Sequence, residues 1–499
     1  MFQKLIRNKP TYIEKIVTDI LLSQEGASMK NKCSLYFITI FISLIFTQSS
    51  FASDKNIAGT WLGTLKVQTM ELRIVFHIQT DSTGVMKATL DSPDQGAKGI
   101  PVDNVSTRLD SVILTINAIG GSYEGIAQPG DSIITGTWKQ GGLALPLDIH
   151  RTHEIAELRR PQEPKPPFPY DAEEVSCENS DAGITLAGTF TKPKSGGPFP
   201  ALLLITGSGP QNRDEELFGH KPFLVIADYL TRRGIAVLRV DDRGTGKSTG
   251  VFGMATTKDF AGDVRAGIRY LKSRSDVDVK KIGLLGHSEG GIIAPMVASD
   301  SKDVAFIVMM AGPSLPGEQI LYLQDSLIST AMGIPPAEIT KELRLNRALY
   351  SLIRTESDST KLQQEIRSAV KESMSADSAT IGKVNEEAVN AAVKQLTSPW
   401  FRFFVTYDPI PALEKVTCPI LALDGSRDLQ VPAQQNVAGL ERAFKASGNK
   451  NATAKLLPGL NHLFQKAETG APLEYAKIEE TINPEALKVI GDWIEGVTR

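Results

Sequence analysis

The feature that most constrains this chain is an apolar segment that runs into a Gly-x-Ser-x-Gly turn and then into a second apolar segment. Residues 282–285 read Ile-Gly-Leu-Leu, residues 286–291 read Gly-His-Ser-Glu-Gly-Gly, and residues 292–298 read Ile-Ile-Ala-Pro-Met-Val-Ala. A sharp turn between a strand and a helix strains its serine and leaves the hydroxyl exposed, while the glycines prevent side-chain collisions. The pattern predicts that Ser288 is a nucleophile. The alternative is an ordinary glycine-rich turn without a catalytic role. That interpretation requires that the other two residues of a catalytic triad be missing.

Candidate partners for such a serine, an acid and a histidine base, occur downstream in the sequence. A serine hydroxyl needs a base to take its proton, and the base needs an acid to orient it. An apolar strand predicted over 420–423 leads into the loop Asp-Gly-Ser-Arg-Asp at 424–428. We assign the acid to Asp428, because functional residues favour the loop at the carboxyl end of a strand, and keep Asp424 as the second candidate. His462 follows another short apolar strand and is assigned as the base.

Elimination supports this histidine. The chain has six histidines, and four of the others lie in the amino-terminal region or an early loop: His77, His150, His153 and His220. The fifth, His287, adjoins Ser288, where a sharp turn points neighbouring side chains apart. The order serine, acid, histidine, each after a strand, is the order expected of an α/β-hydrolase.

The stretch from about 174 to 499 therefore resembles the α/β-hydrolase superfamily. Gly-His-Ser-Glu-Gly-Gly at 286–291 and Leu-Asp-Gly-Ser-Arg-Asp at 423–428 resemble its serine aminopeptidase-like branch, which includes many bacterial carboxylesterases and feruloyl-esterase-like enzymes. Asp-Asp-Arg-Gly-Thr-Gly-Lys-Ser at 241–248 is similar to the Asp-x-Arg-Gly-x-Gly-x-Ser turn of these enzymes.

Acyl transfer also needs donors for the oxygen that becomes negative, and backbone N–H groups supply them without reorganisation. One donor should be the N–H of Glu289, the residue after the nucleophile. By resemblance, Thr-Gly-Ser at 206–208 stands where family members carry His-Gly-x, which implies the N–H of Ser208 as the second donor. A threonine replaces the usual histidine here, so Gly209 stays an alternative donor.

Neither a cofactor nor a metal is predicted. Gly-Lys-Ser at 246–248 lacks the first glycine of a phosphate-binding P-loop, whose position holds Asp241. Gly-Ser-Gly at 207–209 lacks the third glycine of a dinucleotide fingerprint, whose position holds Asn212. The histidines are scattered and no Cys-x-x-Cys occurs. A net charge of −3 offers no basic footprint for nucleic acid.

A stretch near the amino terminus has the pattern of a secretory signal peptide. Two lysines precede an apolar run over 35–46, and Ser-Phe-Ala at 50–52 supplies small residues at positions −3 and −1 of a cleavage site. We expect residues 1–52, which include an upstream extension before Met29, to be removed. The mature protein would begin at Ser53 and be exported, to the periplasm or outside the cell, with no membrane span. An uncleaved anchor is the alternative, although the run is shorter than the about 20 residues that a spanning helix needs.

The remaining chain divides by pattern into three parts. Short alternating strands with glycine and aspartate turns predict a small antiparallel β domain over 53–155, and a proline-rich stretch predicts a stiff linker over 156–173. Apolar strands alternating with helices over 174–499 predict a mostly parallel sheet covered on both faces. Within it, a helix-rich segment over about 313–410 is too long for a connection and is predicted to be a cap. Its aromatic stretch 399–407 suits an acyl or aryl pocket and ordinary core packing equally.

The leading functional hypothesis is an exported serine carboxylesterase that acts on a small-molecule ester. Ser288 attacks the ester carbonyl, His462 transfers the proton, Asp428 orients His462, and water then cleaves the acyl-enzyme. A peptidase or aminopeptidase of the same fold is one alternative, because the same machinery cleaves amides. A binding protein that kept the fold and lost the chemistry is another. Acyl and alcohol preference depend on cap geometry, which sequence patterns do not specify, and the oligomeric state is unknown.

Overall fold

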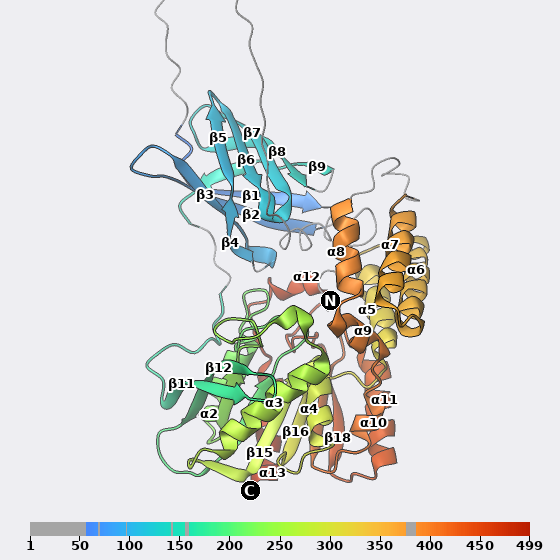
Figure 1. Ribbon diagram of the computed structural model, residues 1–499. Coiled ribbons are helices and arrows are strands. Elements are labelled where there is room, and N and C mark those ends of the chain that lie inside the picture. The colour runs from blue at the N-terminus through green and yellow to red at the C-terminus, as the bar shows by residue number, and fades with distance from the viewer. Residues whose placement is uncertain (1–55, 68–69, 96, 141–142, 155–158, 376–385) are drawn as a thin grey trace, which may run out of the picture. The chain divides into compact units, whose positions relative to one another are not determined.

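The computed structural model describes residues 56–67, 70–95, 97–140, 143–154, 159–375 and 386–499. The predicted signal peptide and Ser53 lie outside these residues. The chain forms two compact units, one built from strands β1 to β10 and one that comprises the described residues from Arg159 to the carboxyl terminus (Figure 1). Over the described ranges, no helix has the length and apolar character that a membrane crossing requires.

The first unit is an antiparallel sheet in the order β4-β3-β2-β1-β10-β8-β7-β6-β5, with β9 paired to β8. Its side chains alternate between the core and solvent, and Trp61, Phe76, Tyr123 and Trp138 are among the largest buried residues. The strands are β1 (Gly59–Val67), β2 (Met70–Thr80), β3 (Met86–Ser92), β4 (Ala97–Val102), β5 (Asn104–Arg108), β6 (Ser111–Ile116), β7 (Gly121–Ala127), β8 (Ile133–Gln140), β9 (Leu143–Pro146) and β10 (Ile149–Thr152). The prediction of a small antiparallel β region is confirmed.

The second unit contains a mixed sheet in the order β11-β12-β14-β13-β15-β16-β17-β18. β12 pairs antiparallel with both β11 and β14, and every later pair is parallel. Its strands are β11 (Tyr170–Asn179), β12 (Ile184–Pro193), β13 (Phe199–Ile205), β14 (Ala236–Val240), β15 (Val277–His287), β16 (Phe306–Met310), β17 (Ile420–Gly425) and β18 (Ala452–Leu457). The central strands read as continuous apolar runs because both of their faces are buried.

Helices cover both faces of this sheet (Figure 1). One face packs against α3 (Thr257–Lys272), α4 (Gly290–Ala298) and α11 (Ala433–Ser447), and the other against α2 (Pro222–Thr231) and α13 (Pro484–Thr498). The short helices η3 (Pro93–Gln95), η4 (Asn117–Ile119), η5 (Phe252–Met254), α10 (Ile410–Leu413) and α12 (Pro472–Tyr475) complete the two units. The predicted mostly parallel sheet with helices on both faces is confirmed, and the carboxyl ends of its parallel strands meet at one edge.

Between β16 and β17 lies a helical insertion with its own core. It comprises α5 (Gly317–Ala331), α6 (Pro336–Thr355), α7 (Ser359–Ser375), α8 (Glu386–Leu396) and α9 (Pro399–Thr406). Phe401 and Phe404 of α9 are buried in this core and Trp400 and Tyr407 pack against it, so four of the five aromatic residues in the stretch contribute to ordinary packing. Ile292 of α4 belongs to the same core, which places the cap on the helix that follows the predicted nucleophile.

The predicted linker over 156–173 differs from the structure in two respects. Strand β11 begins at Tyr170, before the expected boundary at 174, because this segment pairs with β12. Further upstream, the Arg160 guanidinium donates to the backbone carbonyl of Ala476, and the Gln162 amide donates to that of Ile482. The described part of the proline-rich stretch therefore belongs to the second unit.

Candidate active site

Ser288 lies on a strained turn between β15 and α4. Its φ angle is +53°, a left-handed conformation that non-glycine residues seldom adopt and that concentrates at functional sites. Its backbone N–H donates to the carbonyl of Met310 over 2.9 Å, which joins the turn to β16. Ser288 is partly exposed, whereas its neighbours His287 and Glu289 are buried. The turn therefore presents one hydroxyl and hides the flanking side chains.

Two glycines make this turn possible. A Cβ atom at Gly286 would lie 2.0 Å from the carbonyl oxygen of Gly290, and one at Gly290 would lie 2.2 Å from that of Ile205. These contacts are with backbone atoms, which cannot swing away as a flexible side chain can. The glycines are needed because strand β15, helix α4 and the end of β13 approach too closely for any side chain.

The predicted acid and base are in direct contact. Nδ1 of His462 lies 2.7 Å from Oδ2 of Asp428, and both side chains are almost fully buried. The other oxygen of Asp428 accepts the backbone N–H groups of Gln430 and Val431, at 2.7 and 2.9 Å. A carboxylate held in this way acts as an acceptor, so Nδ1 of His462 carries the proton and Nε2 is left free to accept one.

Asp424, the second candidate for the acid, has a different partner. The side-chain amide of Asn436 lies 3.1 and 3.2 Å from its two carboxylate oxygens. Burial, together with the nearby charge of Asp428, raises the pKa of Asp424 well above its ordinary value. The structure thus brings His462 to Asp428, and Asp424 belongs to the packing at the end of β17.

The loop after β13 lies against the nucleophile. A Cβ atom at Gly207 would come within 3.3 Å of Cβ of Ser288. The N–H of Gly207 donates to Oε1 of Glu215 over 2.7 Å, so it is already engaged. Among the residues that the structure describes, the N–H groups of Ser208, Gly209 and Glu289 have no recorded acceptor. Ser208 and Gly209 both remain candidates for the second oxyanion donor, beside Glu289.

Two side chains that the sequence patterns did not single out connect these loops. Nδ1 of His287 lies 2.9 Å from Oε1 of Glu215, and its Nε2 lies 3.0 Å from the backbone carbonyl of His462. Burial disfavours a charge on His287, but the Glu215 carboxylate and the hydrogen bonds more than offset this and raise the pKa of the ring. His287 had been set aside as a base, and Glu215 belongs to no recognisable motif, so no local signal revealed this pair.

Glu289 links the turn to the cap. Its Oε1 accepts the hydroxyl of Thr257 over 2.7 Å and the indole N–H of Trp400, on cap helix α9, over 2.8 Å. Burial raises the pKa of Glu289, while these two donors and the nearby Ser208 hydroxyl act in the opposite direction. Trp400, a member of the aromatic stretch, therefore bonds directly to the residue beside the nucleophile.

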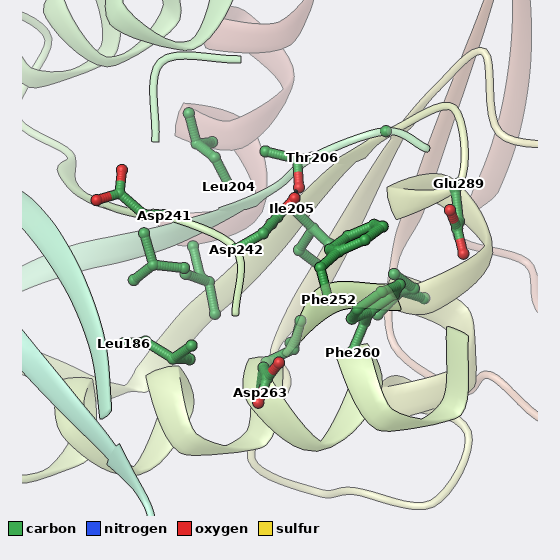
Figure 2. A pocket seen from close by; sticks show the side chains of 15 residues that line it. Leu186, Leu204, Ile205, Thr206, Asp241, Asp242, Phe252, Phe260, Asp263 and Glu289 are labelled. Atoms are coloured by element: carbon green, nitrogen blue, oxygen red, sulfur yellow. Dashed lines mark hydrogen bonds between the residues drawn. The ribbon is translucent and has the colours of Figure 1, made fainter. Parts of the chain in front are cut away.

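A small cavity of about 40 Å³ lies behind the loop after β13 (Figure 2). Glu289, Asp242 and the stacked rings of Phe252 and Phe260 are among its lining residues, whereas Ser288 is not. Its volume suits a few water molecules and is far below the roughly 300 Å³ or more of a typical ligand pocket. Burial raises the pKa of Asp242 to about 8. In the described ranges, no three metal-ligating side chains come together.

Comparison with known proteins identifies the family to which this chain is similar. Residues 222–468 match the family described as "Serine aminopeptidase, S33". The chain belongs to the α/β-hydrolase superfamily. The matched range of this α/β-hydrolase contains Ser288, Asp428 and His462, and it excludes the loop with Ser208 and Glu215.

Individual relatives of this α/β-hydrolase include an esterase and a peptidase. Esterase EstD of Thermotoga maritima is 27% identical over 382 residues, covering 75% of this chain and 82% of EstD. Dipeptidyl peptidase 8 of Homo sapiens is 32% identical over 157 residues, covering 29% of this chain but only 17% of that protein. A solved esterase structure from Pyrococcus furiosus overlaps 66% of this chain and 91% of its own, at 15% identity and a TM-score of 0.39.

Proposed function

We propose that the protein is an exported serine hydrolase that cleaves carboxylic esters through an acyl-enzyme on Ser288. The observation that carries this proposal is the 2.7 Å contact between His462 and Asp428. The backbone carbonyl of His462 is also bonded to the ring of His287, the residue next to Ser288. A nucleophile, a base and an oriented acid are the groups that acyl transfer requires. Similarity to EstD favours esters as the substrate class.

In the first half of the reaction, Oγ of Ser288 attacks the ester carbonyl carbon and its proton passes to Nε2 of His462. The negative oxygen of the tetrahedral intermediate accepts the N–H of Glu289 and that of Ser208 or Gly209. The C–O bond to the alcohol then breaks, and the alcohol leaves with the proton from His462. Asp428 stays ionised and stabilises the imidazolium.

In the second half, water attacks the acyl group on Ser288. His462 takes a proton from that water, the same N–H groups hold the oxyanion, and the proton returns to Oγ of Ser288 as the acid departs. No group outside the chain, its substrate and water takes part in these steps.

A peptidase activity is the second candidate, and the family match to serine aminopeptidases favours it. The two reactions use the same groups, so substrate preference separates them. Turnover of short p-nitrophenyl esters and of aminoacyl naphthylamides by one preparation tests which activity is the main one. A clear preference for the amides would make peptidase the first candidate.

Export rests on the amino-terminal pattern alone. Mass spectrometry of the protein recovered from each cell fraction tests it, with a mature terminus at Ser53 in an exported fraction as the expected result. A full-length chain retained inside the cell would contradict it.

The decisive assay is p-nitrophenyl acetate turnover by the purified protein and by Ser288→Ala. Loss of a nucleophile in a triad lowers kcat by about 10⁴-fold or more. Ser299→Ala is a matched control, because it removes a hydroxyl just after α4 that bonds only the carbonyl of Met296. Unchanged turnover in Ser288→Ala, with normal activity of the control, would defeat the assignment.

A further inference from the structure

The pair formed by Glu215 and His287 is unusual for its burial. Glu215 is 1% exposed and His287 is 4% exposed, and both are ionisable. Buried charges are retained only where partners and hydrogen bonds satisfy them, and removal of one partner leaves the other uncompensated. The backbone of Glu215 also has a φ angle of +50°, which a non-glycine residue adopts at a cost. The chain therefore maintains this pair against both electrostatic and conformational penalties.

The side-chain hydrogen bonds of the pair connect loops that carry groups of the proposed reaction. Glu215 accepts the N–H of Gly207, the residue before the candidate oxyanion donor Ser208. His287 immediately precedes the nucleophile and bonds the carbonyl of His462, the base itself. The rings of His287 and His462 also lie close, with centroids 4.8 Å apart.

Donor and acceptor chemistry assigns the protons in this chain of contacts. The carbonyl of His462 can only accept, so Nε2 of His287 must carry a hydrogen. Oε1 of Glu215 accepts the N–H of Gly207 and also lies 2.9 Å from Nδ1 of His287. The His287 ring therefore bridges the Glu215 carboxyl group on one loop and the His462 carbonyl on another.

We propose that Glu215 and His287 act as positioning residues that set the spacing between the oxyanion loop, Ser288 and His462. This inference rests on the proposed function and names two residues that neither touch the reacting atoms nor belong to the Ser288, Asp428 and His462 set. A purely structural pair would contribute to folding alone. A positioning pair also governs the chemical step, because reacting groups displaced by about 1 Å lose about 100-fold in rate.

Three variants test the pair. Glu215→Gln keeps the shape and an acceptor oxygen but removes the charge. His287→Gln keeps a donor for the carbonyl of His462 and removes the imidazole that faces Glu215. The double variant leaves two neutral amides that can bond to each other. Thr191→Val is the control for loss of stability, because it breaks a buried 2.8 Å bond between Thr191 on β12 and Thr231 at the end of α2, and neither residue belongs to these loops.

The measurements are kcat and KM for p-nitrophenyl acetate, the rate of labelling by a fluorophosphonate, and the urea unfolding midpoint. Each single variant should lower kcat and the labelling rate by about 100-fold, with KM changed less than about threefold. The double variant should be no slower than the slower single, since residues acting as a unit are not additive. Thr191→Val should lower the midpoint and leave kcat unchanged.

Folded Glu215→Gln and His287→Gln proteins with wild-type kcat would overturn the inference, as would losses that only match the fraction unfolded. If either variant fails to fold, Glu215→Asp keeps the charge and shortens the reach by one methylene. A folded Glu215→Asp protein should be slower with KM retained, and wild-type kcat there would overturn the inference too. Absence of turnover in the wild-type protein would overturn the proposed function, and this inference with it.

Discussion

Replacing Gly286 by alanine should disable the nucleophile without unfolding the protein. The added Cβ would lie 2.0 Å from the carbonyl oxygen of Gly290, whereas ordinary contacts of this kind begin at 3.4 Å. The start of α4 must therefore move away from β15 by about 1.4 Å, and Ser288 lies between them. Displacement of about 1 Å costs about 100-fold in rate, so we expect kcat to fall at least about 100-fold.

Stability should change less than activity. Overpacking typically costs about 1–3 kcal/mol, against about 5–15 kcal/mol that holds a domain folded. The matched control is Gly496→Ala in α13, where an added Cβ meets no atom within 4 Å. Alanine there should raise the free energy of unfolding by about 0.5–1 kcal/mol, because glycine is a poor helix former, and should leave kcat unchanged.

The assay is p-nitrophenyl acetate turnover with urea unfolding on the same preparations. Gly207→Ala offers an intermediate case, because its Cβ would meet Ser288 at the milder distance of 3.3 Å. We expect the order of kcat to be wild type, then Gly207→Ala, then Gly286→Ala. A folded Gly286→Ala protein with wild-type kcat would refute the reasoning that close backbone packing holds the nucleophile in place.

Four other substitutions give separate expectations. Asp428→Asn should lower kcat by about 10⁴-fold, because it no longer fixes the tautomer of His462, whereas Asp424→Asn should stay active; equal losses in the steady-state assay would contradict the choice of acid. Trp400→Phe should lower the free energy of unfolding by about 1–3 kcal/mol, because Glu289 loses a donor; an unchanged urea midpoint would contradict that bond. Asp242 has its pKa raised from 3.8 to about 8, so it binds its proton more tightly when folded. Its stabilising contribution is full below pH 3.8 and is lost as pH rises through about 8. Asp242→Asn should remove that part of the pH dependence. If the free energy of unfolding, measured with urea from pH 5 to 9, changes with pH equally in the two proteins, Asp242 makes no such contribution.

The architecture was accessible from sequence because local patterns encode it. The strained turn at Ser288 depends on glycines within two residues of it, and apolar runs alternating with helices predict the mostly parallel sheet. The predicted start of the second unit at 174 was late, because this unit includes Arg160 and Gln162, whose side chains bond distant carbonyls, and because pairing with β12 extends β11 back to Tyr170.

The supporting contacts of the site could not be read in the same way. Glu215 and His287 are 72 residues apart, Glu289 and Trp400 are 111 apart, and His287 and His462 are 175 apart. Each contact forms only when the loops at the carboxyl edge of the sheet fold over one another. A single sequence carries no periodicity or spacing that reports such encounters, so these residues become visible only in the folded chain.

The central claim is that Ser288 becomes covalently acylated with His462 as its base. Treatment of the purified protein with a fluorophosphonate, followed by peptide mapping with mass spectrometry, tests this most directly. The account predicts one adduct, on the peptide that contains Ser288, and a sharply reduced labelling rate in folded His462→Ala. An adduct on another residue, or labelling of His462→Ala at the wild-type rate, would contradict it.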